Sequence, residues 1–362
     1  MLRVFTAFSG YDSQCMALDK LGADYDLVGW SEIDKYAIQA HDAIYPQYAA
    51  RNYGDISKIN WAEVPDFDLF TYSFPCQDIS IAGMQQGLEE GSGTRSSLLW
   101  DCKKAIEAKK PKYLVMENVK ALTFAKFAPY LEHWKQYLAS LGYTQFAKML
   151  NSRNYGIPQN RDRFFMVSIL DREAKFDFPP PFELKLRIKD LLEKNIQTKY
   201  YLSDFVQGHF HIIENKNNIV GSTAKTSRTI IINELVYGVD GIIGSLLASD
   251  YKRPKQIIVG DDDSLIPKIR QATKKEYAEK PSYDVYKALR SKQIQIRKLT
   301  PREGFRFMGV SETYIDKIQA SGLSDSQQRK LAGNSIAVDV LYYIFRKLFA
   351  PNELYYVDDA DL

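Results

Sequence analysis

Short apolar runs alternate with amphipathic stretches along the first 170 residues of the chain. The apolar runs predict buried strands, because buried parallel strands are nearly continuous runs of apolar residues. These runs are Leu2–Phe8, Tyr25–Trp30, Phe67–Tyr72 and Tyr113–Met116. Apolar residues at helical spacing predict helices over Ser13–Leu21, Asp34–Ile44, Leu98–Ala108 and Phe127–Leu141. The alternation predicts a mostly parallel sheet with helices on both faces.

Two further strands, Phe146–Leu150 and Arg163–Ile169, follow one another with no helical pattern between them. We therefore expect them to pair antiparallel at the edge of the sheet. The prolines at 179–181 then end the alternation and predict a domain boundary.

The chain beyond this boundary is organised differently. From 185 to 296 the periodicity is poor, and short β-rich pieces stand at Thr229–Ile232 and Gln256–Val259. After this segment the pattern becomes helical again. Asn334–Phe349 predicts one long amphipathic helix, and Asp358–Leu362 predicts a loose acidic tail.

Composition excludes several classes of protein. Of the 362 residues 45% are hydrophobic and 26% charged, as in soluble globular proteins, and no apolar run approaches the about 18 residues that span a membrane. The apolar start at Leu2–Phe8 is too short for a signal peptide. Three cysteines cannot build a disulfide framework, and four scattered histidines, of which His209 and His211 are the closest pair, cannot close a metal site. We expect a cytoplasmic enzyme or binding protein that uses no metal.

The net charge of +3 is an average over two unlike parts of the chain. Residues 185–300 hold 21 Lys and Arg against 13 Asp and Glu, whereas the rest of the chain holds 27 against 32. A basic segment within an acidic frame suggests a partner that carries phosphates, although a solvated basic face gives the same count. We predict that 1–184 and 297–362 form one discontinuous α/β domain, and that 185–296 form a smaller, irregular β-rich domain.

Candidate chemistry begins at Cys76, which follows Pro75 just past the end of a predicted buried strand. Open α/β sheets bind their ligands at the carboxyl ends of their strands. A cysteine there is either a nucleophile or a small core residue, since free cysteine is among the most buried residue types. The glycine-rich stretch Ser80–Thr94 that follows predicts a long loop that can close over a substrate.

Glu117 ends the next predicted strand, so a parallel sheet brings it to the same edge as Cys76. A carboxyl group beside a thiol suits general acid catalysis. Arg161 and Arg163 are two residues apart, and on one strand they would share a face, from which they can orient Glu117 or hold a phosphate.

Four short motifs follow one another along the chain: Pro-Cys-Gln at 75–77, Glu-Asn-Val at 117–119, Gln-x-Arg-x-Arg at 159–163 and Gly-Asn-Ser at 333–335. In this order they resemble the DNA (cytosine-5)-methyltransferases, especially those of bacterial restriction–modification systems. The resemblance covers most of the chain outside 185–296. It implies a Rossmann-like methyltransferase domain, double-stranded DNA as the substrate, and S-adenosylmethionine as the cofactor, with S-adenosylhomocysteine as its product.

The resemblance also implies a mechanism. The Cys76 thiolate adds to C6 of a cytosine that has flipped out of the duplex, and C5 then takes the methyl group. Glu117 hydrogen-bonds N3 and the amino group of the base, and burial of this carboxyl group raises its pKa so that it can donate a proton. Arg161 and Arg163 orient the base carbonyl and Glu117.

The turn between the first strand and the first helix resembles the family's cofactor-binding pattern, Phe-x-Gly-x-Gly. Phe8 and Gly10 are present, but Asp12 and Ser13 replace the later glycines. Asp tolerates a left-handed backbone, so we expect the turn to persist, with the start of the helix facing a polar, partly anionic group of the ligand. A carboxylate near the methionine end of the cofactor would favour the ammonium group.

Other blocks complete the expected cofactor site. Glu32 ends the second strand, where an acidic residue bonds ribose hydroxyls, and the resemblance puts Asp55 at the adenine amino group and Ile56 on its ring. Taken alone, Glu32 and Asp55 would be interpreted as a helix cap or a surface turn. The Gly-Asn-Ser motif is expected to start the last helix and to return beside the first strand. The full set of cofactor residues is Phe8, Gly10, Asp12, Glu32, Ile33, Asp55, Ile56, Pro75, Leu98, Asn334 and Ser335.

Residues 185–296 occupy the position of the family's target-recognition domain. Within them Gly244-Ser245-Leu246 resembles the family's Thr-Leu element, with Ser in place of Thr. Beyond them Arg302 resembles the residue that organises the base of that domain. Lysines and arginines of this segment would grip phosphates without reading the sequence.

Two other functions share part of the pattern. The family's tRNA-modifying branch also carries Pro-Cys-Gln and Glu-Asn-Val, but its Cys-Phe-Thr element is not found here, and the basic segment favours DNA. Against a non-catalytic DNA-binding relative stand the intact Cys76, Glu117, Arg161 and Arg163. We expect a cytoplasmic monomer, encoded by a bacterium or phage, with a restriction endonuclease encoded nearby as a candidate partner.

Overall fold

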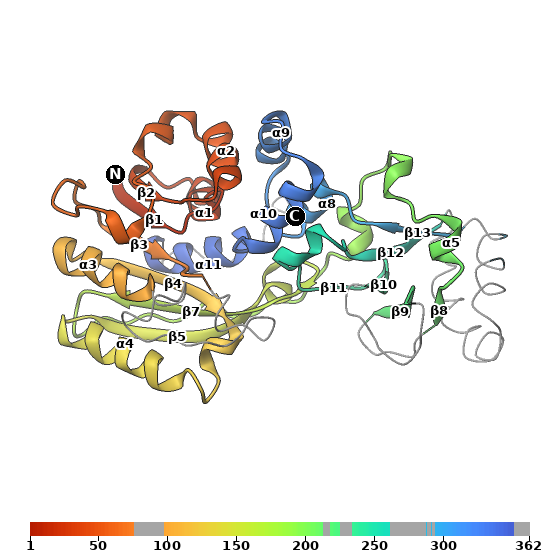
Figure 1. Cartoon of the computed structure of the whole chain (residues 1–362). Helices are drawn as coiled ribbons and strands as arrows, with labels where there is room; N and C mark the ends of the chain where they lie inside the picture. The colour runs from red at the N-terminus through yellow and green to blue at the C-terminus, as the bar shows by residue number, and fades with distance from the viewer. Residues whose placement is uncertain are drawn as a thin grey trace.

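The computed structural model describes residues 1–75, 98–212, 218–224, 234–260, 287, 291 and 294–350. Its main sheet has six strands in the order β2–β1–β3–β4–β7–β5 (Figure 1). They are β1 (Leu2–Ala7), β2 (Tyr25–Ser31), β3 (Leu69–Tyr72), β4 (Tyr113–Val119), β5 (Thr144–Asn151) and β7 (Asp162–Ile169). The first four pair in parallel, and β7 runs antiparallel to both β4 and β5. The predicted parallel sheet with an antiparallel pair at its edge is confirmed.

Helices cover both faces of this sheet, because successive residues of a strand point to opposite sides. Val4 of β1 belongs to the core that also contains α1, α2 and α11, whereas its neighbour Phe5 belongs to the core that contains α3 and α4. The helices are α1 (Ser13–Leu21), α2 (Lys35–Ile44), α3 (Leu99–Lys109), α4 (Ala128–Ser140), α5 (Asp204–Gln207), α8 (Pro301–Arg306), α9 (Glu312–Ala320), α10 (Asp325–Asn334) and α11 (Val338–Phe349). None of the helices in the described part of the chain is both long and apolar enough to cross a membrane.

The prediction of one helix over Asn334–Phe349 is wrong, because α10 ends at Asn334 and α11 begins three residues after Ser335. The carbonyls of Gly333 and Ser335 accept hydrogen bonds from the guanidinium of Arg161 at 3.2 and 2.6 Å. Carbonyls at the end of a helix have no intrahelical donor. The guanidinium of Arg161, which is distant in sequence, therefore supplies the hydrogen bonds that the carbonyls at this break need. The amphipathic pattern alone does not indicate the break.

A second sheet of five strands, in the order β13–β12–β10–β9–β8, lies to the right of α8 and α10 in Figure 1, with the main sheet to their left. Its strands are β8 (His211–Ile212), β9 (Ile219–Ser222), β10 (Leu235–Gly238), β12 (Gln256–Val259) and β13 (Gln295–Lys298). The predicted β-rich piece Gln256–Val259 is confirmed as β12. The predicted pieces Thr229–Ile232 and Asp358–Leu362 lie outside the described residues.

The two sheets are joined by backbone pairing and by packing. The short strand β11 (Ile243–Gly244) pairs in parallel with β6 (Gln159–Asn160), which precedes β7. The apolar core around α1 and α11 continues into the second sheet through residues such as Val236 and Ile257. β13 also crosses the predicted boundary between 296 and 297, so the domain limits stay a prediction.

Close packing of α10 against the backbone beside β11 can be tested at Gly333. A Cβ atom on Gly333 would lie 2.3 Å from the carbonyl of Leu247, so either α10 or that segment must shift. We expect Gly333→Ala to lower the free energy of unfolding by about 1–3 kcal/mol, as overpacked sites do. Urea denaturation measures this change.

The control is Gly304→Ala in α8, where the nearest atom to an added Cβ is 3.8 Å away. Because a helical glycine costs about 0.5–1 kcal/mol relative to alanine, this variant should be at least as stable as the original chain. A Gly333→Ala protein as stable as the original chain would contradict the close packing.

Candidate active site

The edge of the main sheet at which β3 and β4 end carries the candidate catalytic groups. These strands are parallel neighbours with Tyr72 opposite Met116, so Glu117 lies at the edge toward which the chain leaves β3. Cys76 and the rest of the loop at 76–97 lie outside the described residues, and Pro75 is the last described residue before them. The common edge of the two strands is confirmed, and the role of Cys76 stays a prediction.

Asn118 ties the segment before Cys76 to the end of β4. Its buried side-chain amide donates to the carbonyl of Phe74 at 3.1 Å. Asn118 stands in the Glu-Asn-Val motif, but no role was predicted for it from the sequence. The available signal was a polar amide directly after Glu117 in an otherwise apolar strand, which calls for a fixed partner because unpaired buried amides are costly.

Glu117 is buried, with 8% of its surface exposed, and its Oε1 lies 3.0 Å from Nε of Arg163. Burial raises the pKa of Glu117, and the positive charges of Arg163 and Arg161 oppose that rise without cancelling it. The raised pKa expected from the sequence is confirmed in direction. The arrangement presents a carboxyl group that can hold a proton and is oriented by a neighbouring guanidinium.

Arg161 has a different set of partners. It falls at the break between β6 and β7, so the expectation that both arginines share one strand is wrong. Only 1% of Arg161 is exposed, and its guanidinium donates to the carbonyls of Leu246 (2.7 Å), Gly333 and Ser335. These contacts hold three backbone segments together. The positive charge of Arg161 is also close enough to Glu117 to lower the pKa of that carboxyl group.

Gln159 reinforces the same junction. Its fully buried amide donates to the carbonyl of Phe307 at 2.5 Å and accepts from the N–H of Leu246 at 2.8 Å. Sequence reasoning assigned this residue no role, although its place in Gln-x-Arg-x-Arg was a signal. The Leu246 segment, which resembles the family's Thr-Leu element, therefore lies against the motif's glutamine and first arginine.

The base of the second sheet is held by a pair that the sequence analysis did not single out. Arg297 and Glu303 form a buried bidentate ion pair at 2.8 and 2.7 Å. Arg302, expected to organise this base, bonds Glu312 and Asp316 on α9 at 2.6 and 2.5 Å and lies 3.7 Å from Glu193 of the 185–296 segment, so its expected role stays a prediction.

The turn between β1 and α1 has the left-handed backbone that glycine usually provides. The φ angles of Phe8, Gly10 and Asp12 are 56°, 60° and 68°. The Asp12 carboxylate is fully buried, where it accepts from the hydroxyl of Thr6 at 2.9 Å and from the N–H of Cys15 at 3.1 Å. The expectation that Asp12 preserves the turn is confirmed.

The same contacts bear on one expectation about the ligand. Asp12 acts as the N-cap of α1, so its own carboxylate already occupies the start of the helix. A second anion is disfavoured beside it. The expected contact of the helix start with an anionic ligand group and the expected contact of Asp12 with a cofactor both stay predictions.

The blocks expected to bind the cofactor gather beside this turn. The carboxylate of Glu32, at the end of β2, accepts from the N–H of Gly10 at 3.0 Å and from those of Ile33 and Asp34. The Ser31 hydroxyl donates to the carbonyl of Gly54 at 2.6 Å, which brings the 54–56 block to the same edge. A fixed carboxylate and a 71% exposed Ile33 side chain suit a ribose and the flat ring next to it.

The other expected cofactor residues have more varied surroundings. Asp55 caps a short 3₁₀ turn through the N–H and hydroxyl of Ser57, which hold the pKa of Asp55 below its usual value. Ile56 is buried in the core, and Leu98 is half-buried directly before α3. Asn334 is exposed at the end of α10. The hydroxyls of Ser335 and Ser13 are 2.6 Å apart, so Gly-Asn-Ser does return beside the cofactor turn, although it ends a helix and starts none.

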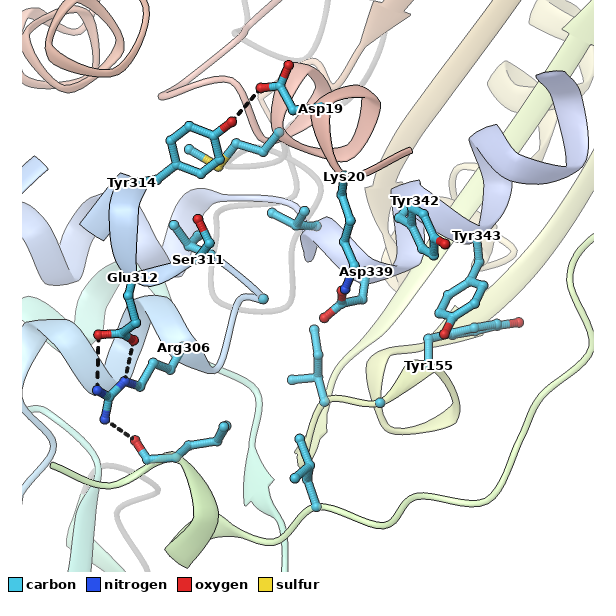
Figure 2. Close-up of a pocket in the computed structure, with 18 of the residues that line it drawn as sticks. Asp19, Lys20, Tyr155, Arg306, Ser311, Glu312, Tyr314, Asp339, Tyr342 and Tyr343 are labelled. Carbon is cyan, nitrogen blue, oxygen red and sulfur yellow. Dashed lines mark hydrogen bonds and ion pairs between the residues drawn. The ribbon is translucent and has the colours of Figure 1, made fainter. Parts of the chain in front are cut away.

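A cavity of about 590 Å³ lies apart from these residues. It is bounded by the last turn of α1, by α11 and by the segment before α9 (Figure 2). None of the predicted site residues lines it. Among its charged side chains, Lys20 pairs with Asp339 at 2.8 Å and Arg306 with Glu312 at 2.7 Å. No group of three His, Cys, Asp or Glu residues that could hold a metal is found among the described residues.

Comparison with known proteins agrees with this arrangement. Residues 2–350 match the model of the C-5 cytosine-specific DNA methylases. The type II methyltransferase M2.ScrFI of Lactococcus lactis subsp. cremoris is 37% identical, over 96% of this chain and 99% of its own. The type II methyltransferase M.HhaI of Haemophilus parahaemolyticus is 32% identical, over 95% of this chain and 93% of its own.

Solved structures agree on the fold. The Dnmt2 methyltransferase of S. pombe superposes with a TM-score of 0.69 at 20% identity, covering 98% of this chain and 100% of that one. Because the family model spans almost the whole chain and two full-length relatives exceed 30% identity, the chain belongs to the C-5 cytosine-specific DNA methylase family and is a DNA (cytosine-5)-methyltransferase.

Proposed function

We propose that this methyltransferase acts on one sequence of double-stranded DNA, through a covalent bond from Cys76 to C6 of a flipped-out cytosine. The observation that carries the proposal is the buried Glu117–Arg163 pair at the sheet edge where β3 leads through Pro75 to Cys76. A cytosine stacked in a duplex cannot reach a buried carboxyl group, so the base must leave the helix.

The proposed chemistry follows from the weakness of cytosine C5 as a nucleophile. Attack of the Cys76 thiolate on C6 forms an S–C bond and moves the π electrons of the C5–C6 bond to C5. A proton given to N3 by Glu117 offsets the negative charge that this attack creates on the ring. S-adenosylmethionine, when bound, supplies the electrophilic methyl group. Once C5 carries the methyl group, a base takes the C5 proton, Glu117 takes back the proton from N3, and the Cys76 thiolate leaves, which restores the aromatic ring of the methylated base.

Arg163 and Arg161 have different tasks in this scheme. Arg163 touches Glu117 directly and orients it toward the base, whereas Arg161 is a positioning residue that holds backbone segments around the site. The proposed cofactor site consists of the turn Phe8–Asp12, the β2 end at Glu32 and Ile33, the Asp55–Ile56 block, Pro75, Leu98, Asn334 and Ser335. Glu32 would accept from the ribose, and Ile33 would cover the adenine.

We assign DNA recognition to residues 185–296. The excess of lysine and arginine in this region suits phosphate contacts. The Ser245–Leu246 segment is bonded to Gln159 and Arg161, so a side chain here would stand beside the active site. By similarity to the type II methyltransferases, we propose a monomeric modification enzyme of a restriction–modification system, with a cognate endonuclease as its genetic partner.

Methyl transfer tests the substrate and the nucleophile. We expect tritium from labelled S-adenosylmethionine to enter unmethylated duplex DNA but not tRNA, with bisulfite sequencing placing all modified cytosines in one sequence. Labelling of tRNA alone would refute the DNA assignment.

The nucleophile is tested separately. Cys76→Ala should abolish turnover and still bind DNA. A duplex with 5-fluorocytosine at the target should trap an adduct that survives denaturation, because fluorine blocks the final elimination; its absence on a verified target would exclude Cys76 as nucleophile.

The pH dependence tests Glu117 as the proton donor. A donor must be protonated, so the rate should fall as pH rises through the raised pKa of Glu117. Glu117→Gln should remove this limb of the pH profile and lower kcat by about 10²- to 10⁴-fold. Arg163→Gln removes a charge that lowers this pKa, so the limb should move to higher pH while the rate also falls.

Asp162→Asn is the matched control, because it changes a half-exposed carboxylate next to Arg163 that pairs with Lys120 and accepts a hydrogen bond from Asn151. The limb should stay in place in this variant. A pH profile that is the same in Glu117→Gln and the original enzyme would rule out Glu117 as the donor.

A further inference from the structure

His41 is a buried histidine to which neither the motifs nor the proposed chemistry gives a role. It lies in α2, and its side chain is fully buried. Its Nε2 is 3.7 Å from a carboxylate oxygen of Asp12, which is also fully buried. Asp12 stands where the family's pattern has glycine, which has no side chain to make this contact. The contact therefore belongs to the replacement.

Both ring nitrogens of His41 face carboxylates. Besides the contact of Nε2 with Asp12, the Nδ1 atom lies 3.4 Å from Oδ1 of Asp42 on the same helix. Nε2 is buried and has no hydrogen-bond partner among the described residues. A ring nitrogen without hydrogen carries a lone pair, which a carboxylate repels. This geometry fits an imidazolium, in which both nitrogens carry hydrogen.

Trp30 supports the His41 ring from one side. The two rings stack with their centroids 3.6 Å apart and an angle of 23° between their planes. A cation is attracted to the face of an indole ring, so the stack also favours a charged histidine. Trp30 is fully buried in β2, two residues before Glu32. His41 therefore contacts both parts of the proposed cofactor site, the turn at Asp12 and the end of β2.

The Asp12 carboxylate has one cationic side chain within ion-pair distance in the described part of the chain, and that side chain is His41. A buried charge is costly unless it is paired. Without a charge on His41, the carboxylate that shapes the turn would be uncompensated. Other ionisable groups beside α2 have partners of their own at 2.5 to 2.7 Å: Lys330 with Asp34, Arg51 with Asp26, and Tyr45 with Asp19.

We propose that His41 is a positioning residue for the cofactor. As an imidazolium it balances the charge of Asp12, and it thereby keeps the turn Phe8–Asp12 in its left-handed shape. The inference rests on the proposed function, which assigns this turn to the cofactor. The carboxylate and the histidine act as a pair, whereas the family's glycine needs no such partner.

The affinity for S-adenosylhomocysteine, measured by calorimetry at pH 7, tests the pair. His41→Gln should weaken binding at least about tenfold, the factor that one hydrogen bond to a charged group carries. Asp12→Gly restores the family's residue, which adopts this backbone freely and is tolerated as an N-cap, so it should bind within about threefold of the original chain. In the Asp12→Gly chain, His41→Gln should change the affinity less than about twofold.

His133→Gln is the matched control, because it makes the same substitution at an exposed histidine of α4, on the opposite face of the main sheet. It should leave the affinity unchanged. In kinetics, His41→Gln should raise KM for S-adenosylmethionine at least about tenfold and change kcat less than about twofold, because a saturating cofactor restores the turn.

Nitrogen NMR measures the charge of the ring directly and does not require His41→Gln to fold. The chain has four histidines, so the His41 signals are those that remain when the other three are replaced by Gln. At pH 7 both ring nitrogens should carry hydrogen in the original chain, and only one should in Asp12→Gly.

A neutral His41 ring at pH 7 in the original chain, or the same loss of affinity on His41→Gln with and without the Asp12 carboxylate, would overturn the pairing. Either result can occur in an enzyme that binds S-adenosylhomocysteine and methylates DNA, and the proposed function would then stand. An original chain that binds no S-adenosylhomocysteine would instead refute the proposed cofactor site, and the role of His41 with it.

Discussion

The surroundings of the active site depend on one buried guanidinium. A guanidinium is effectively always charged in proteins, and burying a charge is costly unless hydrogen-bonding partners compensate it. Those partners are backbone carbonyls of the second-sheet region and of the end of α10. The guanidinium finds these acceptors only when both segments return to the junction of β6 and β7. Because an unpaired buried charge would be costly, the need for these hydrogen bonds keeps three distant parts of the chain together.

The neighbouring carboxyl group shows how burial and charge are balanced. Burial raises the pKa of Glu117, and the adjacent charge of Arg163 lowers it. With both present, the pKa is raised while the carboxyl group stays in contact with a cation at 3.0 Å. Such a group can give up a proton when negative charge develops on a bound base, because the guanidinium stabilises the carboxylate that remains.

The turn before α1 keeps its backbone shape although glycines of the family's pattern are replaced. The left-handed conformation of Asp12 costs free energy, and hydrogen bonds from Thr6 and Cys15 offset that cost. The same carboxylate caps the start of α1, so one side chain supplies both the shape of the turn and a partner for the N–H of Cys15.

Sequence alone determined the order of strands and helices over the first 170 residues and the edge of the sheet at which Glu117 stands, because periodicity reports which side of an element is apolar. It also identified the family through ordered motifs. It did not reveal the helix break after Asn334, the separate tasks of Arg161 and Arg163, or the bridge made by Gln159. Their partners lie far along the chain, 85 and 172 residues from Arg161 for Leu246 and Gly333. Only the folded chain decides which carbonyls remain unbonded within reach of a buried donor, and no local pattern records that choice.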